Sequence, residues 1–224
     1  KGWFNRNTGL NPFTREGKKT CSFEIFEQLR RSAPDRVVVP TGDGNIISGI
    51  WKGWRDLHAL GLVERMPKID CVQAESSAAV CRAIDALRKA GRDPLDVDWS
   101  AVKIEPVSAT TVADSISVDQ PRDGIAAMRA VCETGGETVQ VSDESILAAI
   151  PEVARHAGVF AEPAAAAAWT GLKQLAREGR VQAHERIVCL LTGSGLKDVP
   201  AARKAAGDPC VIDANVDAAM AAVG

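Results

Sequence analysis

The fold is decided by one stretch, Arg36-Val-Val-Val-Pro40-Thr-Gly-Asp-Gly-Asn45-Ile-Ile-Ser-Gly-Ile50-Trp-Lys-Gly-Trp54. It opens with β-branched residues, passes through closely spaced glycines, and continues with apolar residues at helical spacing. This order predicts a strand, a glycine loop and a helix. Glycine tolerates positive φ and close backbone approach, and Asn45 is a suitable helix cap. The free amides at such a helix start favour an anion, phosphate above all.

The glycine spacing matches neither of two well-known phosphate-binding motifs. The pattern Gly-x-Gly-x-x-x-x-Gly differs from the dinucleotide-binding pattern, and no Lys-Ser/Thr pair follows its last glycine as in a P-loop. We therefore interpret the loop as a phosphate cradle of another kind. An ordinary tight turn between strand and helix is the alternative, because short glycine motifs often occur without a ligand.

Composition places the chain among globular proteins. Its 224 residues are 46% hydrophobic and 25% charged, with a formal net charge of -2. Such a chain can bury an ordinary core, and its charge gives no reason to expect a nucleic-acid partner. The six cysteines show no CxxC or Cys/His spacing, so no metal site is expected. Because no apolar run is long enough for a bilayer, we expect no membrane contact and a cytoplasmic location.

Further strand and helix patterns follow the glycine loop. Apolar runs at residues 68–74, 137–141 and 186–191 predict strands, and periodic helical stretches separate them. The repeated units predict an α/β fold, an open and mostly parallel twisted sheet with helices on both faces in three layers. Prolines between residues 92 and 122 predict a long irregular excursion.

Other expectations concern the ends of the chain and the weaker patterns. The run at 186–191 is typical of a central parallel strand. We also expect an irregular segment over residues 1–19, a helix over 20–31, a short strand at 159–160 and a weak strand at 210–212.

A second glycine turn, Thr192-Gly-Ser-Gly195-Leu-Lys-Asp198, follows the strand predicted at 186–191. Carboxyl ends of parallel strands meet at one edge of a sheet, so both glycine turns should lie where ligands bind. Ser194 lacks the Gly-x-Ser-x-Gly frame of a serine hydrolase. The histidines fall on helices or near their ends, so no catalytic histidine is expected.

Four stretches together resemble threonine synthase, a fold-type II pyridoxal-phosphate enzyme with two domains. They are Asn11-Pro-Phe-Thr-Arg-Glu-Gly-Lys-Lys-Thr20, Pro40-Thr-Gly-Asp-Gly-Asn-Ile46 with Trp51-Lys-Gly53, Glu162-Pro-Ala-Ala-Ala-Ala167, and the second glycine turn. The resemblance implies pyridoxal 5′-phosphate as the cofactor and places Thr192 beside its pyridine nitrogen. It assigns the cofactor phosphate to the residues of the first loop, Thr41, Gly42, Asp43, Gly44, Asn45 and Ile46.

The resemblance is incomplete in two respects. The first loop is one residue shorter than the family's Gly-Asn-x-Gly-Asn form, and Asp43 stands where that form has Asn. Since a carboxylate repels phosphate unless it turns away or accepts amides, we expect Asp43 to form the turn. The family's Schiff-base lysine precedes the phosphate loop, and none of Lys18, Lys19, Lys52 or Lys197 occupies its position. No catalytic residue is therefore assigned.

The resemblance also implies a division of the chain and a reaction. Residues 1–20 would form a connecting segment, and residues 21–224 the carboxyl-terminal portion of the large cofactor-binding domain. The intact homodimeric enzyme would convert O-phospho-L-homoserine and water to L-threonine and phosphate, and the chain alone would be inactive. Arg15, Lys18 and Asn11 are candidates for positioning the substrate or its phosphate, with surface solvation the stronger expectation for each.

Two alternatives stay open. One is a related fold-type II enzyme, such as a cysteate synthase or a threonine dehydratase. The other is a non-catalytic phosphate-binding α/β module.

Overall fold

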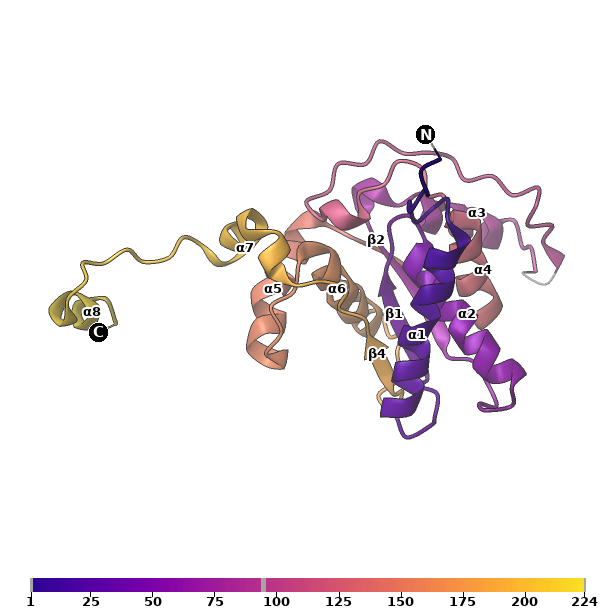
Figure 1. Cartoon of the computed structure of the whole chain (residues 1–224), viewed down its shortest axis with the longest axis horizontal. Helices are drawn as coiled ribbons and strands as arrows, with labels where there is room; N and C mark the ends of the chain where they lie inside the picture. The colour runs from indigo at the N-terminus through magenta and orange to yellow at the C-terminus, as the bar shows by residue number, and fades with distance from the viewer. Residues whose placement is uncertain (1, 94–95, 224) are drawn as a thin grey trace.

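The computed structural model describes residues 2–93 and 96–223. These residues contain a parallel four-stranded sheet between layers of helices (Figure 1). The strands are β1 (Arg36–Pro40), β2 (Lys68–Ala74), β3 (Thr138–Val141) and β4 (Ile187–Cys189), in the order β3-β2-β1-β4. The predicted α/β fold with its three layers is confirmed.

Strand β1 shows why the sheet has two covering layers. Val37 and Val39 pack into one core cluster and Val38 into another, and all three are inaccessible to solvent. Successive side chains of a strand point to opposite faces, so a continuous apolar strand requires cover on both. The first face carries α2 (Asn45–Ala59), α3 (Ala79–Lys89) and α4 (Gly124–Thr134), and the second carries α6 (Pro163–Arg177) with α5 (Asp143–Ala157) against it.

Helix α1 (Pro12–Gln28) packs closely on α2 because two glycines leave room for it. A Cβ on Gly49 would lie 2.6 Å from the Cβ of Lys18, and a Cβ on Gly53 would lie 2.6 Å from the Cβ of Ser22. Residues four apart share one helix face, so both glycines meet α1. The third glycine of the Gly-x-Gly-x-x-x-x-Gly pattern therefore serves helix packing.

Four expectations outside the glycine loop were wrong. Helix α1 begins at Pro12, within the segment expected to be irregular, because Asn11 caps it and proline suits a first turn. Residues 159–160 and 210–212 form no strand. The run at 186–191 yields only the three residues of β4, at one end of the strand order.

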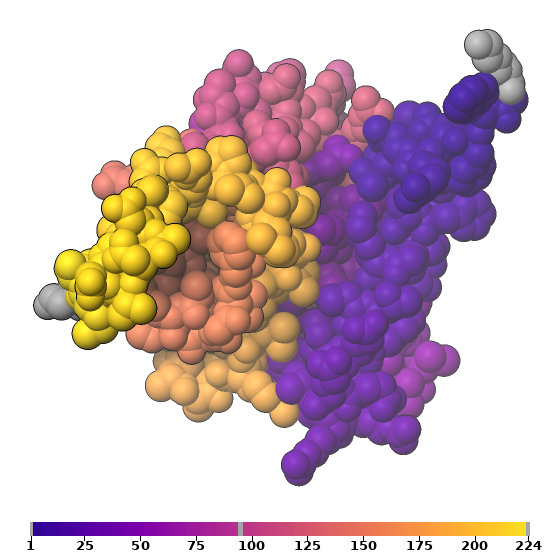
Figure 2. Space-filling model, turned by 60° about the vertical axis from the view of Figure 1, so that its left-hand side comes forward, coloured from indigo at the N-terminus to yellow at the C-terminus, as the bar shows by residue number. Residues whose placement is uncertain are grey.

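The excursion that begins at residue 92 is confirmed where it is described. Between residues 97 and 122 its one regular element is the short helix η3 (Asp114–Ile116). The chain ends in α7 (Val199–Ala206) and α8 (Val216–Val223), and Figures 1 and 2 show α8 far from α1 on the opposite side of the molecule. No described helix is both long and apolar enough to cross a membrane. The division of the chain at residue 20 stays a prediction.

Candidate functional site

The strand order creates one crevice at the carboxyl edge of the sheet. The chain passes from β1 to β2 and β3, and then returns to pair β4 with the other side of β1. Open α/β sheets bind ligands where the strand order reverses in this way. The two glycine turns follow β1 and β4, the strands that flank this point.

A cavity of about 250 Å³ lies at this crevice. Its lining includes every residue assigned to the cofactor by the resemblance, namely Thr41, Gly42, Asp43, Gly44, Asn45, Ile46 and Thr192. The lining also includes Lys18 of α1, Ile116 of η3, Glu162 and Lys197. The structure thus brings both glycine turns to one cavity, while the role of each residue stays a prediction.

The first loop has unpaired backbone donors beside the cavity. The N–H groups of residues 42–47 have no hydrogen-bond acceptor among the described residues. On either side of them, the amide of Thr41 donates to Val72 O at 2.8 Å and that of Ser48 donates to Gly44 O at 3.1 Å. Buried amides without an acceptor are costly and rare. An anion with several oxygens would satisfy them, so the loop fits a phosphate group.

Residues 116–123 form a covering segment over this loop, and they approach it so closely that two positions of the loop require glycine. A Cβ on Gly42 would lie 2.8 Å from the Cα of Ile116. Gly44 has a φ of +89°, and a Cβ there would lie 2.7 Å from the carbonyl oxygen of Asp123. Gly44 is also the N-cap of α2, so the prediction that Asn45 caps the helix was wrong. The Asn45 side-chain amide instead donates to the Asp123 carboxylate.

Asp43 is bonded to the covering segment. Its carboxylate accepts the backbone N–H of Arg122 at 2.6 Å, and its carbonyl oxygen accepts the N–H of Asp123 at 2.9 Å. A carboxylate that accepts amides is stabilised in its charged form even near another anion. These bonds fit the turn-forming role expected from the sequence.

Lys18 brings a cationic group to the cavity from α1. Its ammonium donates to the side-chain oxygen of Asn45. Burial lowers the pKa of Lys18, whereas the charges of Asp123 and Asp43 act to raise it. From the sequence, Lys18 was a candidate only for positioning the substrate or its phosphate, because no local pattern shows that α1 packs against Gly49 of α2.

The start of α6 fixes the second glycine turn. The backbone N–H of Glu162 donates to Gly193 O at 3.0 Å, and the Glu162 carboxylate pairs with Lys197 at 2.8 Å. A Cβ on Gly193 would lie 2.3 Å from that carboxylate, so a larger residue there would displace the Glu162 side chain from its present position. Sequence reasoning missed Glu162, which occupies the N-cap of α6 and is buried without making a capping bond. These contacts hold Thr192 at the cavity wall.

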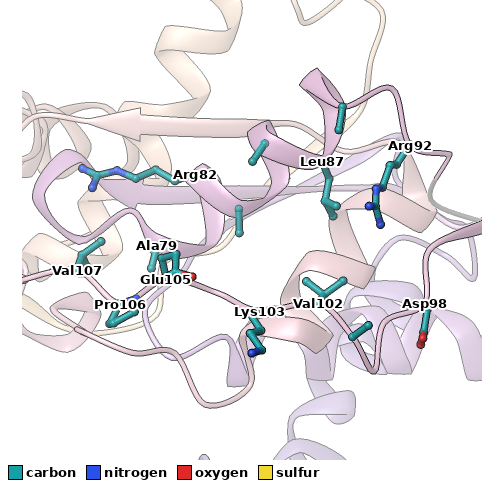
Figure 3. A pocket seen from close by; sticks show the side chains of 14 residues that line it. Ala79, Arg82, Leu87, Arg92, Asp98, Val102, Lys103, Glu105, Pro106 and Val107 are labelled. Carbon is teal, nitrogen blue, oxygen red and sulfur yellow. The ribbon is translucent and has the colours of Figure 1, made fainter.

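A larger cavity of about 490 Å³ lies between α3 and residues 98–107 (Figure 3). Its apolar wall includes Leu87 and Val102, and its charged lining includes Arg92 and Lys103. Its lining contains no glycine and neither of the two glycine turns, so we place the candidate site at the smaller cavity. Within the described ranges, no group of three or more His, Cys, Asp and Glu side chains is arranged to hold a metal ion.

Sequence comparisons agree with the geometry. A sequence model described as pyridoxal-phosphate dependent enzyme matches residues 1–193. The chain is 37% identical over 208 residues to the threonine synthase of Methanocaldococcus jannaschii, covering 93% of this chain and 48% of that protein. It is 38% identical over 214 residues to the threonine synthase of Methanosarcina acetivorans, covering 96% and 50%. The chain thus spans about half the length of these curated relatives.

Solved structures share the fold. Threonine synthase from Escherichia coli matches with a TM-score of 0.63 at 16% identity, over 92% of this chain and 43% of that one. The processed form of threonine deaminase isoform 2 from Solanum lycopersicum matches with a TM-score of 0.64 at 19% identity, over 88% and 51%. At such identities the likeness shows the fold alone, that of fold-type II enzymes. The sequence match reaches further, and by it this chain belongs to the family of pyridoxal-phosphate dependent enzymes.

Proposed function

We propose that this chain forms part of the cofactor site of a threonine synthase. One observation carries the proposal: the amides of residues 42–47 find no acceptor among the described residues, and these residues share a cavity with Thr192. In this assignment the cofactor phosphate is held by the loop, and Thr192 lies beside the pyridine nitrogen. The identities of 37% and 38% to two archaeal threonine synthases favour this member of the family.

The proposed reaction of the whole protein converts O-phospho-L-homoserine and water to L-threonine and phosphate. Pyridoxal phosphate, when bound, supplies an electron sink for the carbanion left by removal of the α proton. This chain binds and orients the cofactor. The loop amides and the N-terminus of α2 neutralise its phosphate. The neutral Thr192 hydroxyl leaves the ring nitrogen largely unprotonated.

Neither lysine of the cavity serves as a covalent anchor in this proposal. The Lys18 ammonium donates to Asn45, and Lys197 is paired with Glu162. We therefore expect the chain by itself to bind the cofactor reversibly and to be catalytically inactive. The complete enzyme is proposed to be a cytoplasmic homodimer that acts on a small amino-acid phosphate.

The experiment is an assay of the protein encoded by the complete gene. We expect O-phospho-L-homoserine to give phosphate and threonine in equal amounts. Release of phosphate without threonine would exclude a threonine synthase. Conversion of threonine to ammonia and a 2-oxo acid would instead favour a dehydratase, the activity type suggested by the deaminase fold neighbour. A gene without any Ser-x-Lys motif upstream of the phosphate loop would favour the non-catalytic module.

A further inference from the structure

We propose that Lys18 binds the anion in the cradle, as a charged partner of the cofactor phosphate that acts together with the loop amides. The identity of the anion rests on the proposed function. The contact itself rests on the position of α1, on the charges around the cavity, and on the hydrogen bond that the ammonium group donates to Asn45.

The packing of α1 on α2 sets the position of Lys18. The Cβ of Lys18 lies where a side chain on Gly49 would be, 2.6 Å from an added Cβ. Gly49 is one turn into α2, so Lys18 lies close to the N-terminal turn of that helix. Lys18 lines the same cavity as Gly42 and Gly44. Its side chain therefore reaches the loop that has the unpaired amides.

The carboxylates around the cavity would disfavour an anion unless a cation were also present. Asp43 and Glu162 line it, and the Asp123 carboxylate accepts a hydrogen bond from Asn45. A phosphate with about two negative charges would be repelled by these carboxylates. Lys197, the other lysine of the lining, is already paired with Glu162 at 2.8 Å. Lys18 is thus the lysine of this lining that is available to an incoming anion.

The one hydrogen bond described for the Lys18 ammonium leaves N–H donors for a ligand. Its ammonium donates to Asn45, a neutral acceptor. The Asn45 side chain is itself held, because its amide donates to Thr8 O at 2.9 Å and to Asp123. An ammonium group has three N–H donors, so two remain for phosphate oxygens. Partial burial strengthens such a contact, since the local dielectric is lower than that of water.

The test compares ligands that differ only in phosphate. Pyridoxine 5′-phosphate and pyridoxine cannot form a Schiff base, so their dissociation constants report non-covalent contacts alone. Titration calorimetry of Lys18→Met should show pyridoxine 5′-phosphate binding weakened by about tenfold or more, as for loss of a charge-assisted hydrogen bond. Inorganic phosphate, followed by ³¹P NMR, should weaken in parallel. Pyridoxine binding should change by less than about twofold.

Lys19→Met is the matched control. Lys19 is the next residue of α1, but it pairs with Glu16 at 2.7 Å and Asp56 at 2.6 Å and does not line the cavity. This variant should bind pyridoxine 5′-phosphate and inorganic phosphate with the same affinities as the unmodified chain. Circular dichroism melting of both variants verifies that each is folded.

The possible outcomes separate this inference from the proposed function. Equal binding of pyridoxine 5′-phosphate by Lys18→Met and the unmodified chain would overturn the contact and leave the cofactor site standing. Binding of inorganic phosphate that depends on Lys18, without binding of pyridoxine 5′-phosphate, would support the contact and overturn the cofactor assignment. An unmodified chain that binds neither phosphate would overturn both.

Discussion

Replacement of Gly44 by alanine is the most direct perturbation of the cradle. Gly44 has a φ of +89°, and an added Cβ would lie 2.7 Å from Asp123 O and 3.1 Å from the Cβ of Ala127. A non-glycine residue in the left-handed region costs about 1–2 kcal/mol. The contact with backbone forces the covering segment to shift, and overpacking of this kind costs about 1–3 kcal/mol more. We expect Gly44→Ala to lower the free energy of unfolding by about 2–5 kcal/mol in total.

Gly61→Ala is the matched control at the other end of α2. Gly61 follows the C-cap of the helix and has a φ of +70°, but an added Cβ would meet no atom of residues 2–93 or 96–223 within 4 Å. Its cost should therefore be the backbone strain alone, about 1–2 kcal/mol. The difference between the two variants isolates the contact of Gly44 with the segment that covers the loop.

Urea unfolding and titration with pyridoxine 5′-phosphate measure the two consequences. Gly44→Ala should be the less stable variant and should lose at least about tenfold in affinity, because the loop amides lose their common direction. Gly61→Ala should keep the affinity of the unmodified chain. The reasoning is refuted if Gly44→Ala matches Gly61→Ala in stability, or if it binds the ligand undiminished.

Three further predictions concern other parts of the same structure. Arg36→Met leaves the buried Asp70 carboxylate without the guanidinium that donates to it at 2.7 Å, and should cost about 3–5 kcal/mol. Burial already raises the pKa of Asp70 in the folded chain. At pH values between the unfolded and the folded pKa, the folded variant therefore carries a proton on Asp70 that the unfolded chain lacks. The variant's free energy of unfolding in urea should therefore increase as the pH falls from neutral toward the unfolded pKa of an aspartate, about 4, and a flat profile would contradict this. Asp43→Asn keeps an oxygen for the amide of the covering segment and removes a charge, so calorimetry should show phosphate binding about two- to fivefold tighter. Weaker binding would show that the charge itself is needed. Gly49→Ala should cost about 1–3 kcal/mol in urea unfolding and should remove the effect of Lys18 on phosphate affinity, whereas an unchanged Lys18 effect would place that lysine independently of α1 packing.

The strand, loop and helix around the first glycine turn were predictable because their signals are local. The β-branched run at 37–39, the glycines and the helical apolar spacing lie within one short stretch. Each favours the same structure, and the observed bounds of β1 and α2 follow them closely. The N-cap of α2 was the exception. Asparagine is a good N-cap in general. The N-cap position of α2 has a positive φ, however, which favours a glycine, and Gly44 occupies it.

Residues that reach the cavity from distant segments were not predictable in the same way. Lys18 and Asn45 are 27 positions apart, and they meet because Gly49 admits α1. Glu162 reaches the cavity from the start of α6, and its partner Lys197 lies beyond β4. These contacts depend on the crossing of elements, which no single stretch encodes. The resemblance of the four stretches assigned Asn45 to the cofactor phosphate but gave no cofactor role to Lys18, Glu162 or Lys197.

Strand β4 shows a different limit of sequence patterns. An uninterrupted apolar run reports that both faces of a strand are covered, and this was the basis for expecting a central strand at 186–191. Position in the hydrogen-bonding order is a separate property, since faces are covered by helices and edges by other strands. In the described sheet β4 pairs only with β1, and its residues are partly buried. The apolar run therefore predicts that helices cover both faces of the strand, but it does not predict the position of the strand in the sheet.

The glycines of this pattern meet two different structural requirements, which a search for the motif alone does not distinguish. Gly42 and Gly44 admit the covering segment to the loop, whereas Gly49 admits α1 to the helix. The first requirement shapes the amides for an anion, and the second sets where Lys18 lies. A relative with a larger residue in place of Gly49 could therefore keep the cradle and lose the lysine contact. In such a relative, phosphate affinity should be insensitive to replacement of the residue at position 18, because the amides alone would hold the anion.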